Sequence, residues 1–338
     1  MNRERLKLYR QLENHRNSKL IVYFTGDRRG LETMIGSDTL VLFTDHLDRI
    51  KKAKKISLYL YTRGGDTLTA WSLVNLIRNF CEELEIIVPF NCHSAGTLIC
   101  LGANKIVMTK QATLGPIDPS INSPFNPPAP GFPPNITLPV SVEHVNSYLE
   151  IAKNVLKIRN SASRSNILIE LSNKIHPHTL GAVYKSRSQI KMIAEKLLNY
   201  QSLNKTQVKR IINFLCSESG SHDYTIYRNE AKESLGLKIE KPSEVEYNII
   251  HDIYNDIQEE LQLLRPYNPV IEMGTETHKQ YNYHRCLIES IDGGVDVFIS
   301  EGTLDKLSGG LQIPGQPIIQ QNIRDTRTFE GWRHEGDE

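Results

Sequence analysis

Early in this chain, extended apolar segments alternate with helical ones, and this alternation constrains the fold more than any other feature. Residues 57–62 alternate like a strand and lead to a helical pattern over 70–77. A second apolar run at 86–90 precedes a helical run at 98–101, and a third short strand is predicted at 103–108. Strands separated by helices pair in parallel through right-handed crossovers, so the sequence predicts an α/β fold.

The first two strand-to-helix turns carry residues suited to catalysis. The first turn contains Gly64-Gly65, and a glycine pair after a strand lets the backbone approach a ligand and point N–H groups at it. The second turn contains Ser94, followed by the small residues Ala95 and Gly96. A serine at such a turn can attack a carbonyl, while nearby amides hold the resulting oxyanion. Either turn alone is more often structural, so the combination indicates the site.

Four segments together resemble the ClpP/crotonase superfamily and, within it, the serine dehydrogenase proteinase group related to SppA-type signal peptide peptidases. They are Thr62-Arg63-Gly64-Gly65-Asp66, Ser94-Ala95-Gly96-Thr97, Leu114-Gly115-Pro116-Ile117-Asp118-Pro119 and His176-Pro177-His178-Thr179-Leu180-Gly181. The resemblance continues through 221–224 and 329–332. It implies a ClpP/crotonase-like spiral core of repeated ββα and βα units and assembly into a homo-oligomer.

The resemblance also implies a hydrolase, a serine endopeptidase that cleaves peptide bonds through an acyl-enzyme on Ser94. The N–H groups of Gly65 and Ala95 would form the oxyanion hole, with Gly64 as an accessory residue. Two alternatives come from other classes of protein. One is a non-hydrolytic scaffold or binding protein of the same fold, and the other is a crotonase-type acyl-CoA enzyme, which the serine at position 94 disfavours.

The general base is the residue that the sequence determines least. ClpP-like enzymes use a histidine with an aspartate, but no histidine lies between Ser94 and His144. SppA-like enzymes use a Ser-Lys dyad, with the lysine on a helix after the loop that follows the third strand. By this resemblance Lys153 is the base and Lys157, one turn later, is the alternative. A buried apolar helical stripe is predicted beside Lys153, formed by Val145, Tyr148, Leu149 and Ala152.

His93 and Asp118 are further accessory candidates. His93 adjoins the nucleophile, but neighbours in an extended turn point apart, so packing under the site or at an interface is the more common role. Asp118 precedes a proline and is equally a turn-forming residue. Other histidines are weighed as candidates for catalysis, subunit contacts or structural roles: His144, His176, His178 and His222. No HExxH motif or matching carboxylate set accompanies them, so we expect no metal, and no phosphate-binding loop or cofactor lysine motif indicates a cofactor.

Composition indicates a soluble enzyme. Of 338 residues, 39% are hydrophobic, which is enough for a core, and the net charge of +1 creates no field that attracts nucleic acid or anionic lipid. The charged N-terminus resembles no signal peptide, and no window reaches the ~20 apolar residues of a membrane helix. The five cysteines form no CxxC pair. We therefore expect a cytoplasmic protein with free thiols, a peptide or protein substrate, no nucleic-acid partner and no membrane span, and a regulatory partner such as an ATPase stays open.

Two regions are predicted along the chain. Residues 1–200 form the peptidase core, and its proline-rich loop at 121–139 is too long for a simple connector, so we interpret it as a lid or substrate-facing flap. Residues 201–338 form a mainly helical C-terminal extension with a terminal β-hairpin around Asp292-Gly293-Gly294. We interpret this extension as an accessory or oligomerisation region.

Overall fold

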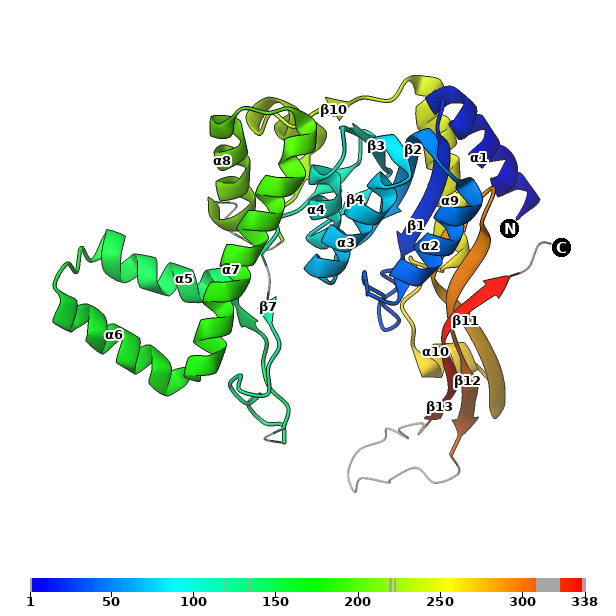
Figure 1. The fold of residues 1–338 in the computed structure, drawn as a ribbon. Coiled ribbons are helices and arrows are strands. Elements are labelled where there is room, and N and C mark those ends of the chain that lie inside the picture. Colours follow the sequence, from blue (N-terminus) through cyan, green and yellow to red (C-terminus); the bar gives the residue numbers. More distant parts are fainter. Residues whose placement is uncertain are drawn as a thin grey trace.

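The structure is a computed structural model that describes residues 2–118, 120–133, 135–218, 221, 223–307 and 323–335. Its centre is an eight-stranded sheet (Figure 1). The strand order is β10 (Ile239–Glu240), β5 (Lys105–Met108), β3 (Cys81–Val88), β2 (Ala53–Tyr61), β1 (Lys19–Thr25), β11 (His278–Ser290), β12 (Gly294–Lys306) and β13 (Ile323–Glu335). The first five strands in this order are parallel, so the predicted mixed α/β architecture is confirmed, while the spiral repeat of the core stays a prediction.

Helices cover both faces of the parallel strands. One face packs against α2 (Thr39–Ile50), α3 (Thr67–Arg78), α4 (Ala95–Leu101), α7 (Pro177–Leu198) and α8 (Lys205–Asn213), and the other against α1 (Arg3–Arg16) and α9 (Glu244–Glu260). In β1, Ile21 and Tyr23 enter the first core, while Val22 and Phe24 enter the second. This burial on both faces explains why the strands are almost continuously apolar.

The predicted hairpin is present but larger than expected. Its strands, β11 and β12, have 13 residues each, and a third strand, β13, pairs with β12, so the hairpin is not terminal. The sequence did not predict that β11 pairs antiparallel with β1. The C-terminal strands therefore continue the central sheet. Near the residue 278 end of β11 the chain also forms the short helix α10 (Pro269–Met273).

An arm that begins at residue 142 and ends within α7 stands away from the sheet (Figure 1). It comprises α5 (Val142–Glu150), a π-helical turn (Ile151–Val155), α6 (Ser161–Lys174) and the first part of α7. No residue of α6 is buried. The predicted buried stripe is wrong at Tyr148 and Leu149, which are 46% and 38% exposed, because no neighbouring element of the described chain covers that side of α5.

The loop at 121–139 starts and ends in a small two-stranded sheet. This sheet pairs β7 (Ser120–Ile121) with β8 (Val140–Ser141). Inside the loop, Asn126 Nδ2 donates hydrogen bonds to the carbonyls of Ile121 and Leu138, at 2.6 and 3.0 Å. The loop is therefore closed on itself at its base.

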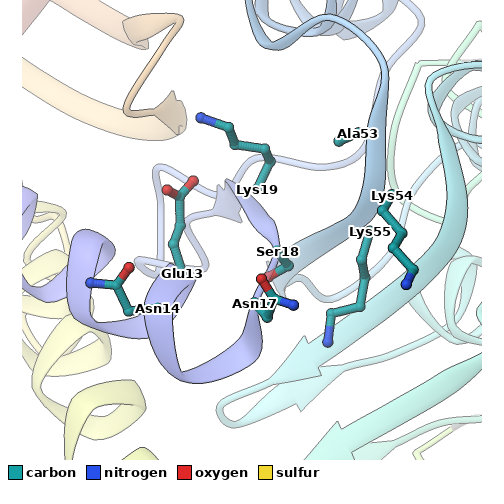
Figure 2. Close-up of a pocket in the computed structure, with 8 residues that line it drawn as sticks. All are labelled: Glu13, Asn14, Asn17, Ser18, Lys19, Ala53, Lys54 and Lys55. Atoms are coloured by element: carbon teal, nitrogen blue, oxygen red, sulfur yellow. The ribbon is translucent and has the colours of Figure 1, made fainter.

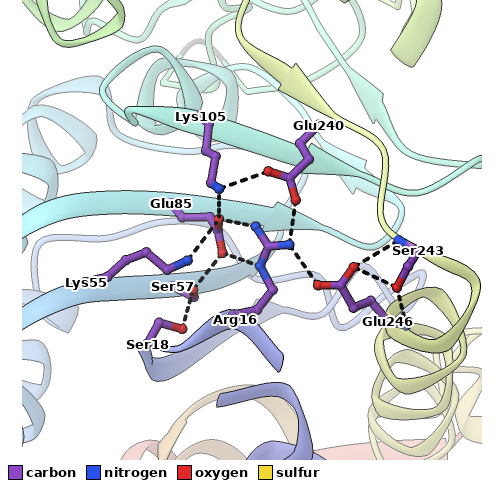
Figure 3. A network of polar contacts seen from close by, with 9 residues as sticks. All are labelled: Arg16, Ser18, Lys55, Ser57, Glu85, Lys105, Glu240, Ser243 and Glu246. Carbon is purple, nitrogen blue, oxygen red and sulfur yellow. Dashed lines mark hydrogen bonds and ion pairs between the residues drawn. The ribbon is translucent and has the colours of Figure 1, made fainter. Parts of the chain in front are cut away.

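Arg16 connects α1 to the second face of the sheet (Figure 3). Its Nε lies 2.9 Å from Glu85 Oε1, and its Nη1 lies 2.8 Å from Glu246 Oε1 and also contacts Glu240. Although burial raises the pKa of Glu240, hydrogen bonds from Arg16 and Lys105 lower it to about 2. Burial likewise opposes ionisation of Glu85, and Arg16 together with Lys55 outweighs it, so the pKa of Glu85 is lowered. This network of charged side chains links α1 to β3, β10 and α9.

Candidate active site

Ser94 occupies a strained turn between β4 (Asn91–Cys92) and α4. Its φ and ψ are 52° and −114°, and the Gly96 N–H donates to the His93 carbonyl at 2.8 Å. These values describe a type II′ turn with Ser94 at the position where glycine is normally required. A side chain held there costs about 1–3 kcal/mol, and such strain concentrates at functional sites.

The hydroxyl of Ser94 is not used to cap the helix that follows it. Serine at an N-cap usually accepts a hydrogen bond from an amide of the first turn, but the Ser94 side chain makes no such bond. The residue is also partly exposed to solvent. Both facts leave its oxygen available for a substrate.

The small residues after Ser94 fit the turn into its surroundings. A Cβ added to Gly96 would lie 2.9 Å from Cys92 Sγ and closer still to Thr62 Cγ2. The Thr97 hydroxyl donates to the Gly115 carbonyl at 2.8 Å and accepts from the Gly115 N–H at 3.1 Å. The Ser-Ala-Gly-Thr string is therefore fixed by packing on one side and by hydrogen bonds on the other.

The Gly64-Gly65 turn lies directly against Ser94. A Cβ at Gly64 would be 2.7 Å from Ser94 Cβ, and the φ of Gly64 is +123°. Gly65 has a φ of +144°, and a Cβ there would lie 2.5 Å from the backbone nitrogen of Ile35. Only glycine fits both positions. The close approach of Gly64 to Ser94 shows that the two turns chosen from the sequence meet in the fold.

Within the described structure, hydrogen bonding leaves two amides at this meeting point unused. The Ile35 N–H donates to the Gly64 carbonyl at 2.8 Å, and the Asp66 N–H donates to the Ile35 carbonyl at 2.9 Å. Among the hydrogen bonds of the described residues, none uses the N–H of Gly65 or of Ala95. These are the two amides that the sequence indicated for an oxyanion.

His93 and Asp118 lie on the β6 side of the turn. His93 Nε2 is 2.9 Å from Thr113 Oγ1 in β6 (Thr113–Leu114), and its ring packs on Gly115. The segment before Asp118 is held by the Ile117 N–H, which donates to the Leu215 carbonyl at 3.0 Å. Pro119 and His222, which the sequence also singled out, lie outside the described residues.

Lys153 and Lys157 both lie on the arm and are exposed. Lys153 Nζ is 4.0 Å from Glu150 Oε1, its side chain is 63% exposed, and Lys157 has a left-handed φ of 53°. No hydrogen bond or ion pair in the described part of the chain joins either lysine to Ser94. The structure thus brings together Ser94, Gly64, Gly65 and Ala95, and it does not bring the two lysines to them.

His176 and His178 belong to a stack at the start of α7. Their rings are 5.2 Å apart and lie 4.8 and 5.3 Å from the Phe125 ring, so the 121–139 loop packs on this helix end. His144 follows the N-cap of α5 and donates its N–H to Ser141 Oγ at 3.2 Å. Within the described ranges, no group of three or more histidine, cysteine or acidic residues is arranged to hold a metal ion.

A second set of serine, histidine and aspartate, distant from Ser94 in sequence, is buried in the fold. His46 Nδ1 is 2.7 Å from Ser290 Oγ, and His46 Nε2 is 3.0 Å from Asp296 Oδ2. All three residues are 5% exposed or less. Ser290 Oγ also accepts the Gly293 N–H at 2.8 Å. Because a substrate has no access to it, this set serves to fasten the β11–β12 turn to α2, and sequence spacing carries no signal for it.

A surface hollow of about 360 Å³ lies at the amino ends of β1 and β2 (Figure 2). Its lining includes none of the residues around Ser94 and consists of Glu13, Asn14, Asn17, Ser18, Lys19, Ala53, Lys54 and Lys55. Because the strands are parallel, this hollow lies at their amino ends and the Ser94 turn lies at their carboxyl ends. Within the part of the chain that the structure describes, every helix is too short or too polar to cross a lipid bilayer.

Comparison with protein families agrees with this geometry. Residues 1–132 match the model of the family described as ClpP-like SDH-type serine proteinase. The matched range contains both the glycine turn and the Ser94 turn. The match confirms the resemblance over this range, which also holds the motif at 114–119.

Two relatives come from Methanocaldococcus jannaschii. Uncharacterized protein MJ0137 is 27% identical over 259 residues, which cover 74% of this chain and 76% of the relative. Uncharacterized protein MJ1495 is 24% identical over 246 residues, which cover 70% of this chain and 71% of the relative.

Two solved structures are similar, both of mutants of 1510-N, a membrane-bound stomatin-specific protease. The mutant in complex with a substrate peptide has a TM-score of 0.37 and 14% identity, covering 64% of this chain and 74% of that chain. The other mutant has a TM-score of 0.38 and 15% identity, covering 72% and 86%.

Proposed function

We propose that this chain, whose residues 1–132 match the ClpP-like SDH-type serine proteinases, is a serine endopeptidase that forms an acyl-enzyme on Ser94. The observation that carries the proposal is the contact between the two turns. The hydroxyl of the strained serine makes no capping bond to the helix that follows it, and the Gly64 backbone packs against this serine. A protein without chemistry at this point has no need for a serine in a conformation that favours glycine.

In this mechanism the Ser94 oxygen attacks the carbonyl carbon of the scissile peptide bond. The N–H groups of Gly65 and Ala95 stabilise the negative charge that forms on the carbonyl oxygen, and both are free of other acceptors in the described structure. The Ser94 proton passes to a general base and then to the leaving amine. Water hydrolyses the acyl-enzyme in the second half of the reaction.

We propose Lys153 as that base, with Lys157 as the alternative. In the present conformation the Lys153 ammonium lies in solvent on the projecting arm. A lysine accepts a proton near neutral pH when it is desolvated, so the arm has to close over Ser94 for Lys153 to act. The exposed apolar side chains of α5 and α6 support such a movement or a contact with a second copy in a homo-oligomer, since either covers apolar surface.

Labelling with a fluorophosphonate tests the nucleophile. The unaltered chain is expected to react, and Ser94→Ala is expected to abolish the label together with peptide hydrolysis. Ser188→Ala is a matched control, because Ser188 is an exposed serine of α7 whose hydroxyl donates to the Tyr184 carbonyl at 3.0 Å. Labelling that persists in Ser94→Ala would refute the proposal.

The non-hydrolytic alternative makes a different prediction. A scaffold of this fold would bind peptides without cleaving them, and its Ser94 would show no more reactivity than Ser188. A crotonase-type enzyme would bind acyl-CoA esters. Binding measurements with a peptide and with an acyl-CoA, beside the labelling experiment, distinguish the three functions.

A further inference from the structure

We propose that Arg63 determines specificity by binding a carboxylate of the peptide substrate close to the scissile bond. This inference rests on the proposed peptidase function. The carboxylate is either an acidic side chain or the C-terminal carboxylate of the peptide, because both offer the same pair of oxygens to a guanidinium.

Arg63 directly precedes the glycine turn of the site. Gly64 contacts Ser94, and consecutive Cα atoms are about 3.8 Å apart, so the backbone of Arg63 is next to the catalytic turn. An extended peptide advances by about 3.3 Å per residue. The long arginine side chain can therefore reach substrate residues within two or three positions of the cleaved bond.

The direction of the side chain follows from the strand. Thr62 is fully buried and packs on Gly96 beneath the serine turn. Side chains of successive residues leave an extended chain on opposite sides, and the Arg63 side chain is 55% exposed. Arg63 thus belongs to the outer surface of the turn.

The guanidinium is held in place by a carboxylate that is itself fixed. Arg63 Nε donates to Asp27 Oδ2 at 2.7 Å, and the Tyr61 hydroxyl donates to the other oxygen, Asp27 Oδ1, at 2.9 Å. Tyr61 stacks on Phe24 with ring centroids 4.2 Å apart and lies 5.7 Å from the ring of Tyr254. The support under Arg63 is therefore a packed aromatic layer.

Both terminal nitrogens of the guanidinium stay available. Within the residues that the structure describes, neither Nη of Arg63 donates a hydrogen bond. The Asp27 side chain is 15% exposed against 55% for Arg63, so an approaching ligand meets the cation before it meets the anion. Two parallel N–H groups on an anchored guanidinium match the geometry of a carboxylate.

A purely structural role accounts poorly for this arrangement. An ion pair with one half-exposed partner contributes little to stability, because solvent screens it. Asp27 also keeps its hydrogen bond to Tyr61 without Arg63. A guanidinium beside the catalytic turn, with neither Nη donating a hydrogen bond in the described structure, is better explained by a substrate contact.

The experiment measures kcat/KM of the full-length chain on fluorogenic peptides. One set of peptides replaces glutamine by glutamate at each of three positions on either side of the cleaved bond. The other set compares a C-terminal carboxylate with a C-terminal amide. We expect kcat/KM to be about 5–10-fold higher for the acidic peptide in one of the two sets, since a charge-assisted hydrogen bond at a partly exposed site contributes free energy of this size. The set of peptides that shows this preference identifies the source of the carboxylate.

Arg63→Gln is expected to bring the ratio of kcat/KM for the acidic peptide to kcat/KM for the neutral peptide down to about one, while the fluorophosphonate still labels Ser94. Arg29→Gln is the matched control, because Arg29 is an exposed arginine of the loop after β1 and its loss changes the net charge equally. An acidic preference that is absent from the unaltered chain, or that survives in Arg63→Gln, overturns the inference while the peptidase activity stands. If no peptide in the series is cleaved, the proposed function itself fails, and the inference fails with it.

Discussion

Substitution of Gly64 by alanine tests the contact on which the candidate site depends. The added methyl group would lie 2.7 Å from Ser94 Cβ and 3.2 Å from the His93 carbonyl oxygen. Ordinary carbon contacts begin at 3.4 Å, so either Ser94 or residue 64 has to move by about 0.7 Å. Displacement of a reacting group by about 1 Å costs about 100-fold in rate, so we expect a loss approaching 100-fold in kcat/KM.

The same substitution also affects stability through the backbone. Alanine at the φ of Gly64, +123°, is strained by about 2 kcal/mol. With an unfolding entropy of about 2.1 cal/mol/K per residue, a 338-residue chain then loses only about 3 °C in Tm. The variant should therefore remain folded at 25 °C while its activity falls.

Gly131→Ala separates strain from contact. Gly131 also has a positive φ, +81°, but a Cβ there meets nothing within 4 Å. It should show a similar or smaller loss of Tm and full hydrolytic activity. The assay pairs thermal unfolding with the rate of fluorophosphonate labelling and with peptide hydrolysis. Normal labelling of Ser94 in Gly64→Ala would refute the argument that the glycine turn positions the nucleophile.

Three further predictions concern parts of the molecule around this site. The folded-state pKa of Glu240 is about 2, below its ordinary value of 4.5. Its ionised form therefore stabilises the fold above pH 4.5, and this stabilisation is lost as the pH falls towards 2. Glu240→Gln should make Tm depend less on pH between 4.5 and 2, and an unchanged dependence would contradict this prediction. His46→Ala removes one hydrogen bond from each of two buried partners, Ser290 and Asp296, and should cost about 2–4 kcal/mol in urea unfolding. Labelling of Ser94 should be undiminished, and lost labelling would mean that the buried set reaches the site. Lys153→Ala should abolish hydrolysis and Lys157→Ala should leave most of it; the opposite result would transfer the role of base to Lys157.

The local pattern of the sequence predicted where the Gly64-Gly65 turn and the Ser94 turn lie in the fold. Strand and helix periods placed the two turns after neighbouring parallel strands, and the carboxyl ends of such strands lie at one edge of a sheet. The contact between Gly64 and Ser94 follows from that rule. The assignment of the Gly65 and Ala95 amides to an oxyanion hole came from the family resemblance and stays a prediction. The strain at Ser94 has no sequence signal of its own, since serine is common in turns of every type.

Features that depend on distant pairing were not predictable. The β1–β11 pairing and the contacts of His46 with Ser290 and Asp296 join residues that no local period connects. The buried stripe on α5 failed for a related reason. An apolar face predicts burial only if another element covers it, and in the described chain nothing covers Tyr148 and Leu149.

The position of β1 between β2 and β11 has a consequence for synthesis of the chain. Until residue 290 has left the ribosome, one edge of β1 has no strand to pair with, although the residues around Ser94 were completed long before. An unpaired apolar edge strand is a template for aggregation. The nascent chain therefore needs its last strands, or a chaperone in their place, to protect a sheet whose first strands are already formed, and a fragment that ends at residue 200 is expected to express as an aggregate.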